Sequence, residues 1–114
     1  MMGQQEEKGT YPAQGECKKT IEILAEFCDR WGYNRVVGEF KSCFLEGLSY
    51  RGYTVNYTIT PVPSGKGEYF IYQILNGEKK IIFSNNKQLH GPQGAVFGYE
   101  IEESNIDKVI EKLQ

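Results

Sequence analysis

The chain has 114 residues, thirteen of them basic and fifteen acidic, and a formal net charge of -2. This length suits one domain with a single hydrophobic core, and the charge balance provides no basic field for nucleic acid. No apolar run approaches the roughly 20 residues that cross a bilayer, and the polar N-terminus has no signal-peptide core. We therefore expect a cytoplasmic protein without membrane or nucleic acid partners.

The cysteines, Cys17, Cys28 and Cys43, are three in number and irregularly spaced. This pattern fits neither a disulfide framework nor a zinc site, so in a reducing compartment we expect free thiols and no metal. Cys43 falls near an apolar helical stripe, which predicts core packing. Cys17 is predicted to be an idle surface thiol.

Residues 1–17 are rich in Gly, Gln, Glu and Lys without periodicity, which predicts a disordered tail before a domain over residues 18–114. Residues 20–27 then alternate, which predicts a strand. Its apolar face comprises Ile21, Ile23, Ala25 and Phe27.

A helix is predicted over residues 33–48, where the apolar period changes to that of a helix. Its stripe comprises Val36, Val37, Phe40, Phe44 and Leu48. Residues 53–60 alternate again and predict a second strand, parallel to the first.

Residues 68–75 and 79–84 have the composition of strands and flank Asn76-Gly77, the strongest short signal for a hairpin. A last helix follows Ser104, a suitable N-cap, and its stripe ends at Leu113. The predicted order is β-α-β-β-β-α. This order predicts a two-layer α/β domain, a four-stranded mixed sheet with two helices on one face.

The candidate reactive residue is Cys28, which ends the first predicted strand just before Gly32 and the predicted helix. A thiol exposed at a strand-to-helix turn lies near unpaired amides and the positive end of the helix dipole, which favour a thiolate. Arg30 would lower the pKa of this thiol and Asp29 would raise it, so the net direction stays open.

The motif Phe27-Cys28, followed after three residues by Gly32-Tyr33, resembles the selenoprotein W/T/H (Rdx) family. The strand–Asn-Gly–strand segment over residues 67–84 is similar to that family's hairpin. In compact size the chain looks most like selenoprotein W. The resemblance implies a thioredoxin-like fold and thiol redox chemistry in cell redox homeostasis, without a bound cofactor.

The resemblance also implies the site. Cys28 corresponds to the family's first redox residue, with Asp29, Arg30, Gly32 and Tyr33 as its binding surroundings. Protein disulfides or thiols would be the partners, and glutathione is a candidate co-substrate.

Trp31 stands where the family has selenocysteine or a second cysteine. Tryptophan cannot attack or resolve a disulfide, so an intramolecular dithiol cycle is absent from this chain. Three explanations stay open: a naturally degenerate site, a recoded selenocysteine codon, and a deliberate substitution. Any redox activity would use Cys28 alone, with an external thiol to clear the mixed disulfide.

The alternative function is a catalytically degenerate thioredoxin-like module that binds a partner protein through Trp31 and Tyr33. The predicted oligomeric state is a monomer or a weak homodimer. Several tyrosines on the uncovered sheet face would offer a dimer surface.

Overall fold

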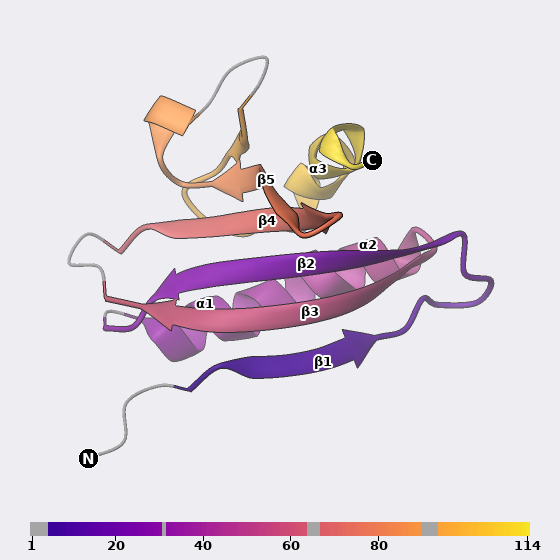
Figure 1. Ribbon diagram of the computed structural model, residues 1–114, viewed down its shortest axis with the longest axis horizontal. Coiled ribbons are helices and arrows are strands. Elements are labelled where there is room, and N and C mark those ends of the chain that lie inside the picture. Colours follow the sequence, from indigo (N-terminus) through magenta and orange to yellow (C-terminus); the bar gives the residue numbers. More distant parts are fainter. Residues whose placement is uncertain (1–4, 31, 64–66, 90–93) are drawn as a thin grey trace.

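The alternating segment after residue 18 forms the central strand of a mixed sheet in the computed structural model (Figure 1), which describes residues 5–30, 32–63, 67–89 and 94–114. Within those ranges the sheet has six strands in the order β1-β3-β2-β4-β5-β6. The strands are β1 (Glu7–Tyr11), β2 (Lys19–Cys28), β3 (Tyr53–Val62), β4 (Tyr69–Leu75), β5 (Glu78–Ser84) and β6 (Val96–Phe97).

One long helical segment connects β2 to β3, and a second helix follows the sheet. The first consists of α1 (Tyr33–Glu39), the π-helical turns η1 (Phe40–Leu45) and α2 (Glu46–Tyr50). The second is α3 (Ile106–Lys112), preceded by the 3-10 turn η3 (Glu103–Asn105); another 3-10 turn, η2 (Lys87–Leu89), follows β5. The predicted α/β class with two helices is confirmed.

Strand pairing agrees with the predicted unit in its central four strands. β2 and β3 are parallel, as a strand–helix–strand connection requires, and β4 is antiparallel to both β2 and β5. The β4–β5 turn has positive φ at Asn76 (53°) and Gly77 (80°), the backbone conformation of a two-residue type I′ hairpin. The Asn-Gly prediction is therefore confirmed.

The prediction of four strands is wrong, because β1 and β6 extend the sheet at its two edges. The prediction of a disordered tail over residues 1–17 is also wrong for Glu7–Tyr11, which pair antiparallel with β3. The reason is tertiary. The outer edge of β3 would otherwise have unpaired backbone N–H and C=O groups, and β1 forms hydrogen bonds with them. This backbone pairing does not require an apolar pattern in β1, so the sequence of β1 did not reveal the strand.

Side-chain contacts hold β1 in place. Glu7 accepts hydrogen bonds from Lys41 Nζ (2.7 Å) and Tyr57 Oη (3.1 Å), which joins β1 to the helix and to β3. The Tyr57 ring lies directly over Gly9, where an added Cβ would be only 2.6 Å from Tyr57 Oη. A side chain at position 9 therefore has no room.

We expect Gly9→Val to destabilise the docking of β1 by about 1–3 kcal/mol, because the Tyr57 ring must move away. Faster hydrogen exchange of the β1 and outer β3 amides would measure this. Lys8→Val adds the same side chain to the exposed face of the same strand and should leave exchange nearly unchanged. Equal exchange in both variants would contradict the expectation.

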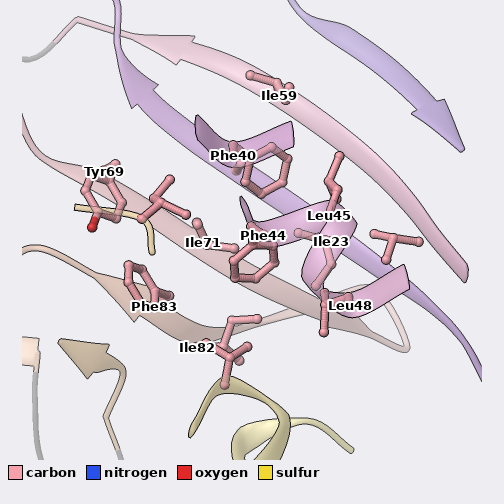
Figure 2. Packing of buried hydrophobic residues seen from close by; sticks show 14 of the residues in the cluster. Ile23, Phe40, Phe44, Leu45, Leu48, Ile59, Tyr69, Ile71, Ile82 and Phe83 are labelled. Atoms are coloured by element: carbon pink, nitrogen blue, oxygen red, sulfur yellow. The ribbon is translucent and has the colours of Figure 1, made fainter. Parts of the chain in front are cut away.

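Both helices pack on one face of the sheet and form one core (Figure 2). Phe40 contacts the rings of Phe27 (5.5 Å between centroids) and Phe44 (5.2 Å), and Phe44 contacts Phe83. α3 joins this core where Ile106 packs against Gly47. Cys43 is partly buried against the cluster, so its predicted core packing is confirmed.

The uncovered face of the sheet is less aromatic than a tyrosine-rich dimer surface would require. The strand registers place Tyr72 on it, opposite Leu24. Tyr53 and Tyr57 pack against the core on the helical face, and Tyr69 belongs to that core. Of these four tyrosines, one remains for a dimer surface.

Candidate functional site

Cys28 is the last residue of β2 and pairs in register with Val62 at the end of β3. The next amide, that of Asp29, donates to the Val62 carbonyl (3.0 Å). The chain therefore stays in the sheet through Cys28 and leaves it only afterwards. Gly32 caps α1, which begins at Tyr33, so the predicted helix start shortly after the thiol is confirmed.

The thiol itself is not exposed. Cys28 is only 5% exposed, so the prediction of an exposed sulfur is wrong. Cys28 is still part of β2 through its pairing with Val62, so its side chain lies on the sheet and does not project from the turn. Strand alternation places its side chain on the face opposite Phe27, away from the helix-side core.

The residues after Cys28 form a short, charged turn. Arg30 is exposed, and its Nε lies 3.9 Å from Asp29 Oδ1, a loose ion pair. Among the described residues, Asp29 Oδ1 is a buried side-chain oxygen without a hydrogen-bond donor. Trp31 lies outside the described residues.

Gly32 adopts a left-handed conformation (φ 67°), which glycine enters without strain, and its carbonyl accepts a hydrogen bond from the Val36 amide (2.9 Å). Tyr33 belongs to the hydrophobic core and is 7% exposed. Burial, and then the charge of Glu7, raise the pKa of its phenol. The turn therefore contains three of the predicted binding residues, Asp29, Arg30 and Gly32. The fourth, Tyr33, offers little surface to a partner.

A hollow of about 250 Å³ lies at the same end of the sheet, on the side of the helices. Its lining comprises Arg35, Val36, Glu39, Gly67, Tyr69, Asn85, Tyr99 and Glu100. Tyr69 lies opposite Phe27 in the β2–β4 register, one residue from Cys28. The hollow thus lies at the end of the sheet where β2 gives way to the turn, on the face opposite the Cys28 side chain.

The sheet side of the hollow is held by specific hydrogen bonds. Asn85 accepts from the Tyr69 amide (3.0 Å) and donates to the Gly67 carbonyl (3.1 Å), while the Tyr69 hydroxyl donates to the Gly98 carbonyl (2.6 Å). The prediction from sequence missed this hollow, because its residues come from four separate segments without a shared motif.

Cys17 lies at the other end of β2. It is exposed and accepts a hydrogen bond from Thr54 Oγ1 (3.2 Å), which lowers the pKa of its thiol. The strand Lys19–Cys28 separates it from Cys28 at about 3.3 Å per residue. The two thiols are therefore at opposite ends of the sheet, as predicted, and Cys17 cannot resolve a Cys28 intermediate without unfolding β2.

The described residues contain no cluster of three His, Cys, Asp or Glu side chains that could ligate a metal. Nor does any helix in the described part of the chain have the length and apolar character needed to span a bilayer. Comparison with protein-family models, with curated proteins and with solved structures finds no match to this chain.

Proposed function

We propose that the protein is a cytoplasmic thioredoxin-like thiol redox protein, similar to selenoprotein W, that acts through Cys28. The main support is the position of Cys28. It ends the central strand of a β3-β2-β4-β5 arrangement and stands five residues before Tyr33, where the helix begins. The sequence resemblance of the Cys28–Tyr33 motif supports the same function.

The proposed reaction uses one thiol. The Cys28 thiolate attacks a disulfide of a partner, forms a mixed disulfide and releases the partner's other sulfur as a thiolate, which takes up a proton. An external thiol such as glutathione then attacks the mixed disulfide and leaves as a new disulfide with the partner's sulfur, which restores the Cys28 thiol. Because Cys28 is 5% exposed, the groups that cover its sulfur must move before attack.

Alkylation kinetics test this function. In a Cys17→Ser, Cys43→Ser background, we expect iodoacetamide to label Cys28 in the folded protein. The labelling should proceed in the absence of urea, faster than global unfolding. Intact mass as a function of pH and time measures the rate. A matched variant that retains only Cys17 controls for an exposed thiol away from the turn.

The result that would contradict the redox function is labelling of Cys28 only in parallel with global unfolding in urea. In that case the sulfur would be inaccessible in the folded protein. Codon 31 of the natural gene addresses the separate question of Trp31. UGG would end the recoding explanation, and UGA with a selenocysteine-insertion element would establish it.

The low exposure of Cys28 favours one second candidate, a thioredoxin-like module that binds a partner protein without catalysis. The two functions make different predictions for Cys28→Ser. Partner binding that survives this substitution unchanged favours the binding module. Loss of disulfide exchange with retained folding favours redox function.

A further inference from the structure

The hollow beside the turn is physically connected to the candidate redox site. A Cβ built on Gly32 would lie 3.6 Å from the Nε and Nη2 atoms of Arg35, which lines the hollow. On the sheet side, Tyr69 is the neighbour of Phe27, the residue before Cys28. The hollow therefore lies at the same end of the sheet as Cys28, on the face opposite the Cys28 side chain.

The charges in the hollow favour a cation. Arg35 Nη1 is already bound to Glu39 Oε2 (2.9 Å), so these two charges offset each other. Glu100 is exposed and, within the described residues, has no ion-pair partner. Its charge is therefore the uncompensated one among the lining side chains.

The aromatic wall also suits a cation. Tyr99 is 68% exposed, an unusual position for a large ring, and its edge-to-face contact with Phe97 (4.8 Å between centroids) fixes its orientation. Lys87 Nζ lies 5.3 Å from the centre of the Tyr99 ring, so a ligand cation would contact the part of the ring that Lys87 leaves open. Lys87 itself is outside the lining of the hollow.

We propose that this hollow binds a lysine or arginine side chain of a partner polypeptide, against the Tyr99 ring and the Glu100 carboxylate. This proposal rests on the proposed function for the polypeptide nature of the ligand. A volume of about 250 Å³ is below the range of about 300–1,000 Å³ typical of small-molecule sites, and it suits one long side chain.

Noncovalent titration tests the proposal without redox chemistry. The protein would be Cys28→Ser, and the probes would be blocked alanine pentapeptides with Arg, Lys, norleucine or Glu at the centre. We expect the Arg and Lys peptides to shift the amide NMR signals of Arg35, Tyr99 and Glu100. They should bind about tenfold more tightly than norleucine, which has similar length without charge. The Glu peptide should not bind.

Matched variants identify the group responsible. Glu100→Gln should weaken binding of the Arg peptide about tenfold, and Tyr99→Ala should weaken it severalfold. Glu22→Gln makes the same charge change at an exposed position of β2 on the opposite face, and it should have no effect. Equal binding of the Arg and norleucine peptides, or an unchanged Glu100→Gln variant, would overturn the proposal.

The outcome for Cys28 is measured separately by alkylation of the cysteine-containing protein. A reactive Cys28 with unselective peptide binding would overturn the basic side-chain site alone. Selective binding of Arg and Lys peptides beside an unreactive Cys28 would overturn the redox function and leave the binding site intact.

Discussion

Phe40→Ala is expected to lower the free energy of unfolding by about 3–5 kcal/mol, the largest effect of any single substitution considered. Phe40 is fully buried at the start of the π-helical turns, and its ring contacts Phe27, Phe44 and Tyr57. Truncation removes apolar contact area and leaves a cavity that rings from the sheet and the helix cannot easily fill. The midpoint of urea unfolding, followed by circular dichroism, measures the loss.

Tyr50→Ala is the matched control, because it removes a ring of similar size from the end of the same helical segment. Tyr50 is 61% exposed, so its removal should change the free energy of unfolding by no more than about 0.5 kcal/mol. Similar losses in the two variants would mean that the core does not lie between this helix and the sheet.

The second large effect is expected at alkaline pH, where the protein should lose stability steeply above pH 10. Burial, followed by the charges of Glu39, Glu100 and Glu102, raises the pKa of Tyr69. Burial also raises the pKa of other tyrosines, namely Tyr33, Tyr57 and Tyr72. Each of these phenols is held neutral by the fold and ionises more easily in the unfolded chain.

The direction of the effect follows from proton linkage. A folded pKa above the unfolded value of about 10 means that the stabilisation is complete below pH 10. It is lost as the pH rises toward the folded pKa. Ionisation of Tyr69 alone should lower the free energy of unfolding by about 1.4 kcal/mol per pH unit in that window. Ionisation of the three more accessible tyrosines should lower it by less. Urea midpoints at several pH values from 8 to 12, with tyrosinate absorbance, measure it.

Tyr69→Phe separates this effect from general alkaline damage. The variant loses the hydrogen bond to the Gly98 carbonyl (2.6 Å) and should be less stable than the parent at pH 8. Its stability should nevertheless fall less steeply above pH 10, because one buried phenol is absent. The same slope in both proteins would show that Tyr69 ionises without unfolding.

Much of the fold was predictable from local patterns. Residues 20–27 and 53–60 lie in β2 and β3, Asn76-Gly77 forms the hairpin turn, and α1 begins at Tyr33 as predicted. These features depend on side-chain period and on backbone preferences of single residues, which are properties of short segments.

The candidate site was predictable only in its order along the chain. The sequence placed Cys28 at the end of a strand and Gly32 before a helix, and the structure agrees on both. It did not indicate that Cys28 pairs with Val62, nor that its side chain is only 5% exposed. Exposure depends on what packs over a residue, and that packing involves parts of the chain far away in sequence.

The sequence alone thus determined the type and order of the main elements, and the position of one cysteine at a strand-to-helix connection. Only the tertiary structure decided that β1 completes an edge of the sheet, that the Cys28 sulfur is shielded, and that Arg35 and Glu100 line one hollow. The physical reason is the range of the forces involved. Backbone conformation responds to neighbouring residues, whereas edge pairing, burial and charge clustering are settled by contacts between distant segments.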